Sequence, residues 1–268
     1  MYVEGSKRIA CKQIGAVASV TNSNDRSVSP SSFKRIIIIV GGYGSGKSEV
    51  SVNLARHLAS GGTAPISIAD LDIVNPYFRS REAASELEAF GVKCLIPAGG
   101  QVFADLPIII PEIKGAIGRN DGFLILDVGG DDVGARVLSS LADAFSPDGY
   151  DMLLVLNARR PFTSDMEGAI RMLKEIEAAS RLKFTGIISN THLMEDTTEQ
   201  TVLEGLSLAH EVSARSGLPI QFLSAAREIS RRLDGRKIDV PLFPLDRALV
   251  KPWEHKGRTW TDKRLRIH

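Results

Sequence analysis

The sequence predicts an α/β protein, a three-layer α/β/α sandwich whose mostly parallel sheet has about seven strands. Short apolar runs alternate with segments whose apolar residues recur at helical spacing, which indicates strand–helix–strand units with right-handed crossovers. Most of the apolar runs are continuous and rich in β-branched residues, as expected for strands covered on both faces. The predicted strands span residues 35–40, 66–69, 92–97, 123–127, 152–157, 184–190 and 220–224.

The helices between these strands are predicted from their apolar faces. After the first strand, Val50, Leu54 and Leu58 recur every four residues, and the two glycines that follow Ser60 end this helix. A later helix begins behind Ser164 and Glu167, which have the spacing of a capping box.

The chain is predicted to hold one large domain over residues 34–239. Residues 1–33 are rich in Ser, Asn and Gly and show no sustained period, which favours a flexible N-terminal extension. Residues 240–268 contain three prolines and no clear period. We expect this C-terminal tail to pack on or near the domain.

Composition and charge exclude several classes of protein. Hydrophobic residues make up 43% of the 268 residues, charged residues 24%, and the net charge is +1, so no electrostatic binding to nucleic acid or to a membrane surface is predicted. No apolar run approaches the roughly 18 residues that a membrane span needs. The two cysteines, Cys11 and Cys94, have no metal-binding spacing and fit a reducing compartment. We therefore expect a cytoplasmic protein without a membrane anchor.

The most specific motif is a phosphate-binding loop at residues 41–48. The letters GGYGSGKS match the Walker A pattern G-x-x-x-x-G-K-[ST] at every fixed position, between a predicted strand and a predicted helix. Such glycines let backbone N–H groups converge on phosphate oxygens, and the helix N-terminus adds its dipole. We expect Lys47 to bind the β- and γ-phosphates of a nucleoside triphosphate and Ser48 to bind Mg²⁺. The predicted nucleotide-binding residues here are Gly42, Tyr43, Gly44, Ser45, Gly46, Lys47, Ser48 and Glu49.

Acidic residues at the ends of two predicted strands complete a magnesium site. Asp127 ends one strand and begins D-x-x-G, so Asp127 is predicted to hold Mg²⁺ through water and the Gly130 amide to contact the γ-phosphate. Asp70 and Asp72 follow another strand and project to the same side of an extended segment. Asp70 is predicted to support the metal, and Asp72 to position the attacking water as a catalytic residue. The alternatives are a cap or turn role for Asp127 and a solvated acidic turn for the pair.

The base is predicted to be adenine. Guanine-specific GTPases usually carry N-K-x-D after a late strand, whereas this chain reads S-N-T-H-L there, without the lysine and the aspartate. The amide of Asn190 offers both a donor and an acceptor, which suits adenine N6 and N7. Asn157 ends the preceding strand in the same way, and either asparagine could instead be a strand-end turn residue.

In order and spacing, these motifs resemble the MinD/ParA/CobQ group of SIMIBI-class P-loop NTPases, also described as the CobB/CobQ/MinD/ParA nucleotide-binding domain, over about residues 34–235. The resemblance implies a P-loop NTPase fold, a first switch loop at residues 70–79 with Asp72 for water activation, and a second switch that includes Asp127 and Gly130. Many members carry a lysine directly after the first P-loop glycine, which reaches across an ATP-bound dimer. Gly42 stands at that position here, so whether the protein forms a homodimer is left undecided by the sequence.

These observations predict a Mg²⁺-dependent ATPase, a hydrolase that acts as a nucleotide-driven switch on a protein partner of unknown identity. ATP would order the two acidic loops, and hydrolysis would relax them. Two other functions stay open: an ATP-dependent small-molecule ligase or kinase of the CobB, dethiobiotin synthetase or polynucleotide kinase type, and a binding module that does not hydrolyse ATP. Residues 251–268 carry six Lys or Arg against two Asp or Glu, but we expect a packed or solvated tail rather than a nucleic-acid contact.

Overall fold

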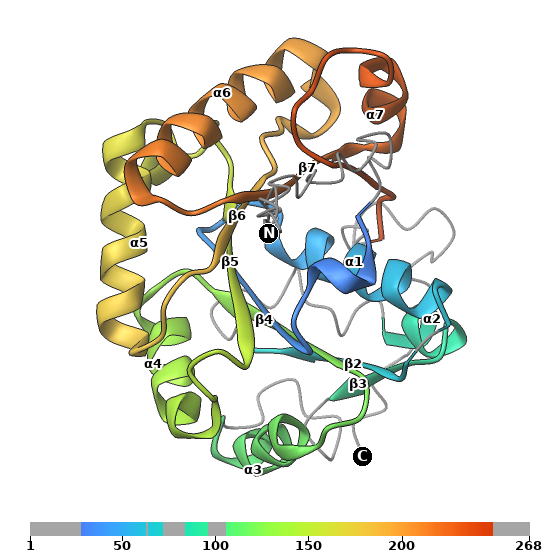
Figure 1. Cartoon of the computed structure of the whole chain (residues 1–268), viewed down its shortest axis with the longest axis vertical. Helices are drawn as coiled ribbons and strands as arrows, with labels where there is room; N and C mark the ends of the chain where they lie inside the picture. The colour runs from blue at the N-terminus through green and yellow to red at the C-terminus, as the bar shows by residue number, and fades with distance from the viewer. Residues whose placement is uncertain (1–27, 63, 72–83, 96–105, 249–268) are drawn as a thin grey trace, which may run out of the picture.

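The computed structural model describes residues 28–62, 64–71, 84–95 and 106–248 of the chain. They contain one sheet in the strand order β3-β2-β4-β1-β5-β6-β7-β8, and every neighbouring pair is parallel (Figure 1). The strands are β1 Ile36–Gly41, β2 Ile66–Asp70, β3 Val92–Leu95, β4 Phe123–Gly129, β5 Tyr150–Leu156, β6 Gly186–Ser189, β7 Ile220–Ala226 and β8 Leu242–Leu245.

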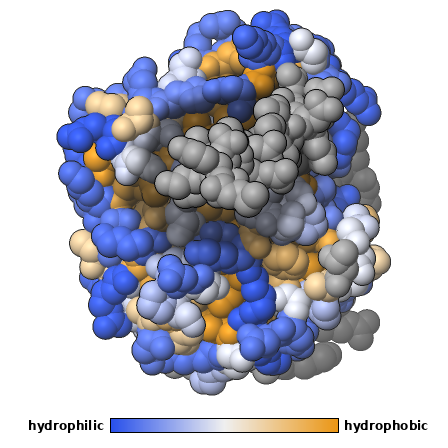
Figure 2. All heavy atoms as spheres, in the orientation of Figure 1, coloured by the Kyte–Doolittle hydropathy of each residue, from blue (hydrophilic) through white to orange (hydrophobic). Residues whose placement is uncertain are grey.

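Helices cover both faces of this sheet, which confirms the predicted three-layer α/β fold. One face packs against α1 and α2, and the other against α3, α4, α5 and α6 (Figure 1). The helices are α1 Lys47–Ser60, α2 Ala84–Ala89, α3 Leu106–Gly118, α4 Asp132–Leu141, α5 Met166–Ser180, α6 Glu199–Ser216 and α7 Arg227–Leu233. On the face seen in Figure 2, hydrophilic residues predominate around the rim and apolar residues show toward the middle. None of the described helices combines the length and the apolar character that a membrane crossing requires.

Strand β1 lies inside the sheet between β4 and β5 and explains the run of isoleucines in the sequence. Ile36 and Ile38 belong to the core on one face, and Ile37 and Ile39 to the core on the other. All four side chains are buried, because successive residues of a strand point to opposite faces and both faces are covered. The strand is thus a rigid support for the loop that follows it.

The sheet has eight strands rather than about seven, because the segment predicted as a C-terminal tail contributes β8. Leu242 and Leu245 pair in register with Leu223 and Ala226 of β7. The strand is short and contains Pro244, which removes a backbone donor and is tolerated at a sheet edge. These features gave no strand signal in the sequence, and the predicted domain end at residue 239 is therefore too early.

The predicted start of the domain at residue 34 is also slightly late. Val28 and Phe33 are both buried in the core on the α1 side of the sheet. The Phe33 ring meets the ring of Phe222 on β7 edge to face, with centroids 6.4 Å apart. The last residues of the predicted N-terminal extension therefore close one end of the hydrophobic core. Residues 1–27 lie outside the described part of the chain.

The predicted capping box of α5 is wrong by one residue. Asp165 is the N-cap, and its carboxylate accepts a hydrogen bond from the Gly168 amide at 2.7 Å. Ser164 instead donates its hydroxyl to the Pro161 carbonyl, within the turn that precedes the helix. Aspartate caps a helix as well as serine does, so the pattern located the helix start but not the capping residue.

Candidate functional site

The phosphate-binding loop connects the end of β1 to the first turn of α1. Its backbone turns at Gly44 and Gly46, whose φ angles are +71° and +86°, a conformation that side chains with a Cβ rarely adopt. A Cβ on Gly46 would also lie 2.3 Å from Nδ2 of Asn190. The helix starts immediately afterwards, with Lys47 and Ser48 exposed to only 6% and 4%. The predicted strand–loop–helix context of the Walker A motif is therefore present in the described structure.

The loop that follows β4 lies directly against the start of this phosphate-binding loop. Strand β4 pairs with β1, so that Gly129 is the register partner of Gly41. A Cβ on the next residue, Gly130, would lie 2.6 Å from the carbonyl carbon of Gly41, so only glycine fits there. Gly130 thus has the close approach that its predicted contact with a γ-phosphate requires, and the contact itself stays a prediction.

Two buried carboxylates stand side by side at the same end of the sheet. Asp70 on β2 and Asp127 on β4 are register partners, and they are exposed to only 6% and 0%. The backbone supports this pairing, since the Leu71 amide donates to the Asp127 carbonyl at 2.8 Å. Ionised carboxylates this close repel each other, and a divalent cation offsets that repulsion. The predicted binding of Mg²⁺ by Ser48, Asp70 and Asp127 stays a prediction; their oxygens are of the hard type that this cation prefers.

The predicted catalytic residue Asp72 lies outside the described residues, as does the rest of the predicted first switch loop after Leu71. The described residues therefore include Asp70 at the end of β2, which is predicted to support the metal, but not Asp72. The role of Asp72 stays a prediction.

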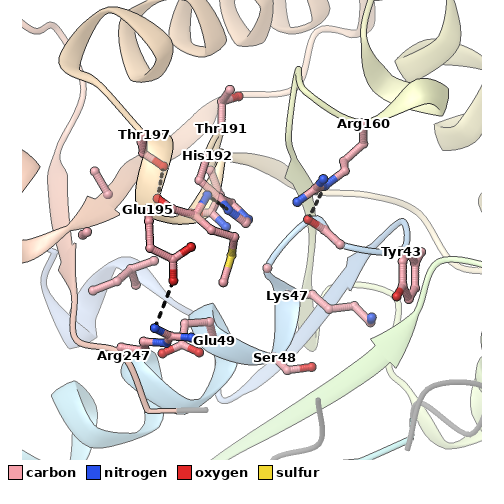
Figure 3. Close-up of a pocket in the computed structure, with 17 residues that line it drawn as sticks. Tyr43, Lys47, Ser48, Glu49, Arg160, Thr191, His192, Glu195, Thr197 and Arg247 are labelled. Atoms are coloured by element: carbon pink, nitrogen blue, oxygen red, sulfur yellow. Dashed lines mark hydrogen bonds and ion pairs between the residues drawn. The ribbon is translucent and has the colours of Figure 1, made fainter. Parts of the chain in front are cut away.

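A pocket of about 530 Å³ opens beside the loop, on the side of β6, β7 and β8 (Figure 3). Cavities of this size hold mononucleotide-sized ligands. The residues that line it come from the phosphate-binding loop, from the turn after β5 and from the carboxyl ends of β6, β7 and β8. They are Tyr43, Gly44, Gly46, Lys47, Ser48, Glu49, Arg160, Asn190, Thr191, His192, Met194, Glu195, Thr197, Ala225, Ala226, Leu245 and Arg247. Most of the predicted nucleotide-binding residues are thus brought together, since carboxyl ends of parallel strands share one edge.

Asn190 fastens β6 to the phosphate-binding loop. Its Nδ2 donates to the Ser45 carbonyl at 2.8 Å, and its Oδ1 accepts from the Ser224 hydroxyl at 2.9 Å. One amide hydrogen and one carbonyl lone pair remain for a further partner. The predicted contact of Asn190 with adenine stays a prediction, and the residue has an additional role in holding the loop.

Asn157 at the end of β5 holds the same loop from the other side. Its Nδ2 donates to the carbonyls of Gly44 and His192 at 3.4 and 3.3 Å, and its Oδ1 accepts from the Arg159 amide at 2.9 Å. The last contact closes a turn of the kind that strand-end asparagines favour. Both strand-terminal asparagines therefore position the phosphate-binding loop.

The predicted nucleotide-binding residue Glu49 supports the segment that follows β8. Its carboxylate accepts a hydrogen bond from the Ala248 amide, and one turn later Asn53 bonds both to the amide and to the carbonyl of Asp246. Arg247, which lies between Asp246 and Ala248 in the sequence, lines the pocket and forms an ion pair with Glu195 at 3.2 Å (Figure 3). The first two turns of α1 thus fix one wall of the pocket.

Sequence reasoning missed Arg160, His192 and the Glu195–Arg247 pair. Arg160 directly follows the β5 strand end, and its Nε donates to the Gly44 carbonyl at 2.7 Å (Figure 3). Their only signal in the sequence was position, since each follows the carboxyl end of a strand, where ligands of parallel sheets bind.

His192 is neutral at physiological pH in this site. Its pKa is lowered from 6.5 to about 4, mainly by burial and then by the positive charge of Arg160, while a hydrogen bond with the Ser45 backbone opposes the shift. The imidazole therefore adds no positive charge to the pocket.

The buried His192 should make the protein less stable in mild acid. Its folded-state pKa lies below the unfolded value, so the unfolded chain binds the extra proton first, and stability is lost as the pH falls from 6.5 toward 4. Between pH 7 and pH 5 this one group should lower the free energy of unfolding by about 2 kcal/mol. Urea unfolding of the wild type, of His192→Gln and of the exposed control His210→Gln measures it. An equal pH dependence in all three would contradict the assignment.

No protein family model matches the chain, and no curated protein is significantly similar to it in sequence. The nucleotide-binding protein of Archaeoglobus fulgidus in complex with ADP has a similar fold, with a TM-score of 0.45 and 18% identity over 75% of this chain and 86% of that one. The cell division protein FtsY of Thermotoga maritima gives a TM-score of 0.44 and 20% identity over 78% of this chain and 67% of that one. The signal recognition particle 54 kDa protein of Aeropyrum pernix in complex with GDP gives a TM-score of 0.48 and 21% identity over 74% of this chain and 43% of that one. These are likenesses of fold, so the functional assignment rests on the site residues themselves.

Proposed function

We propose that the chain is a Mg²⁺-dependent ATPase of the SIMIBI class, related to the MinD/ParA/CobQ group, which acts as a nucleotide-driven switch on a protein partner. One observation carries the proposal: a Walker A loop with a buried Lys47 lies at the edge of the sheet where two buried carboxylates, Asp70 and Asp127, are register partners on neighbouring strands. A cation-binding set beside a phosphate-binding loop is what triphosphate hydrolysis requires.

Each part of the site has a separate task in this proposal. The loop amides and Lys47 bind the β- and γ-phosphates, and the Gly130 amide contacts the γ-phosphate. Ser48, Asp70 and Asp127 hold Mg²⁺, which supplies positive charge to the phosphate oxygens when it is bound. Asp72 positions the attacking water.

The proposed base is adenine, and its place is the pocket beyond the loop. The wall there is apolar at Met194, Ala225, Ala226 and Leu245, which suits the faces of a purine ring. Asn190 keeps one donor and one acceptor for the base edge. A sequence without the N-K-x-D guanine motif supports the choice of ATP over GTP.

A nucleotide titration and a phosphate-release assay test the proposed function. We expect Mg·ATP to bind at least about tenfold more tightly than Mg·GTP, by calorimetry, since one well-placed hydrogen bond to the base is worth about that factor. We also expect slow phosphate release from ATP alone. Tighter binding of GTP would make the protein a GTPase, and turnover only with a small acceptor would make it a kinase or ligase. Binding without any release would make it a passive module.

A further inference from the structure

Arg160 has a backbone fixed by the turn after β5. The Arg160 amide donates to the Asn157 carbonyl at 3.2 Å, and the Arg160 carbonyl accepts from the Thr163 amide at 3.0 Å. The Thr163 hydroxyl donates to the same Asn157 carbonyl at 2.8 Å. Asn157 in turn bonds to the phosphate-binding loop through Gly44. The base of the Arg160 side chain is therefore held in a defined position relative to that loop.

The guanidinium of Arg160 lies directly on the phosphate-binding loop. Its Nε donates to the Gly44 carbonyl at 2.7 Å, and a Cβ on Gly44 would lie only 2.8 Å from that nitrogen. Figure 3 shows the side chain reaching down to the loop on the side of Tyr43 and Lys47. The residue also lines the pocket and is half-buried. The loop glycine leaves room for the guanidinium, which places a cation beside the proposed phosphate site.

The charge of Arg160 is not balanced by a carboxylate within the part of the chain that the structure describes. Its neighbour Arg159 forms an ion pair with Glu204, but no ion pair between described residues involves Arg160. Of its side-chain nitrogens, only Nε makes a hydrogen bond to a described residue. A half-buried cation without an anionic partner is costly. Its terminal nitrogens can still donate in the planar fork that matches phosphate oxygens.

The proposed substrate needs a cation at this place. Charge accumulates on the phosphate oxygens as the γ-phosphoryl group leaves, and Lys47 is the only lysine of the loop. The second loop position, which could have carried another cation, is Gly42. His192 next to Arg160 is neutral, so it does not supply this positive charge.

We propose that Arg160 binds the β- and γ-phosphates of the triphosphate through its terminal nitrogens, while its Nε keeps its hydrogen bond to the Gly44 carbonyl. The arginine and the phosphate-binding loop then belong to the same chain. This inference rests on the proposed ATPase function and adds a catalytic residue to it. In the reaction, the water oxygen bonds to the γ-phosphorus, and the bond from that phosphorus to the bridging oxygen breaks with its electron pair staying on ADP. The proton of the water leaves with the released phosphate. Arg160 transfers no proton and stabilises the negative charge on the bridging oxygen.

Substitution of two adjacent arginines tests this role. In Arg160→Gln, kcat for ATP should fall about 100-fold, the usual loss when one donor to a developing charge is removed. The affinity for ADP, which keeps the β-phosphate but lacks the γ-phosphate, should fall less than the affinity for ATP and far less than kcat. The matched control Arg159→Gln removes a neighbouring surface arginine and should keep the wild-type kcat. Circular dichroism and a melting curve show that each variant is folded.

A rescue experiment separates phosphate binding from support of the loop. Millimolar guanidinium chloride should restore part of the turnover of Arg160→Ala, whereas the same concentration of neutral urea should not. An Arg160→Gln variant with the wild-type kcat would overturn the inference alone. The inference would also be overturned if Arg160→Gln lowered the affinities for ADP and ATP equally and left kcat unchanged, because Arg160 would then only support Gly44. Wild-type protein that binds no nucleotide would instead overturn the proposed function, and the inference with it.

Discussion

Replacing Lys47 with alanine is expected to weaken Mg·ATP binding at least about 100-fold and to abolish measurable phosphate release. The ammonium group of Lys47 is the cation of the phosphate-binding loop, and charge-assisted hydrogen bonds to two phosphates are among the strongest in proteins. The side chain is 6% exposed, so water cannot easily replace the ammonium group once it is removed. Isothermal titration calorimetry with Mg·ATP measures the loss.

A matched lysine on the surface controls for this experiment. The side chain of Lys183 is 78% exposed and forms an ion pair with Glu177. Lys183→Ala should therefore bind ATP as the wild type does, since exposed ion pairs contribute little to stability. If Lys47→Ala bound Mg·ATP with unchanged affinity and remained folded, the pocket beside this loop would not be a triphosphate site.

The residues that sequence analysis located correctly share one property: their chemistry follows from a local pattern. The four isoleucines before Val40 predict a buried strand from β-branched residues alone, and the structure places that strand in the interior of the sheet. The Walker A loop is a fixed pattern of eight residues, and it occupies the expected strand–loop–helix junction. Asp127 was predicted to be the last residue of its strand, whereas β4 continues through Gly129, and its binding of Mg²⁺ stays a prediction.

The features that sequence analysis missed depend on contacts between distant segments. Arg160 meets Gly44 across 116 positions of the chain, and neither residue type carries a signal for the other. Strand β8 was missed because four residues with a proline do not have a strand pattern, although pairing with β7 is sufficient to order them. Asn190 was predicted to contact the base, but its bonds to Ser45 and Ser224 follow only from the strand order of the sheet.

The contacts around the phosphate-binding loop link it to the far side of the pocket. The ends of β5 and β6 reach the loop through Asn157 and Asn190, and α1 reaches the segment after β8 through Glu49 and Asn53. Three segments of the sheet edge are therefore attached to one loop and its helix. A nucleotide that shifts the loop would shift all three, which is the coupling that a switch function requires.

Replacing Asp127 with asparagine is expected to remove the magnesium dependence of the site and to lower the turnover of ATP at least about 100-fold. Asparagine keeps the shape of the side chain but carries no charge, and it is a weaker ligand for a hard cation. Asp127 is fully buried beside Asp70, so the negative charge of the pair falls by half. Nucleotide affinity should therefore change little in EDTA, while the gain in affinity that Mg²⁺ gives the wild type should be lost.

Calorimetry measures the affinity of the wild type and of Asp127→Asn for ATP, once in EDTA and once in Mg²⁺. The exposed Asp132 at the start of α4 lies only five positions further along, and Asp132→Asn should keep the wild-type response to Mg²⁺. Wild-type magnesium dependence in Asp127→Asn would move the metal site to Asp70 and to residues outside the described structure. A loss of affinity in EDTA as well as in Mg²⁺ would instead show that Asp127 supports the loop, because a metal ligand acts only when the metal is present.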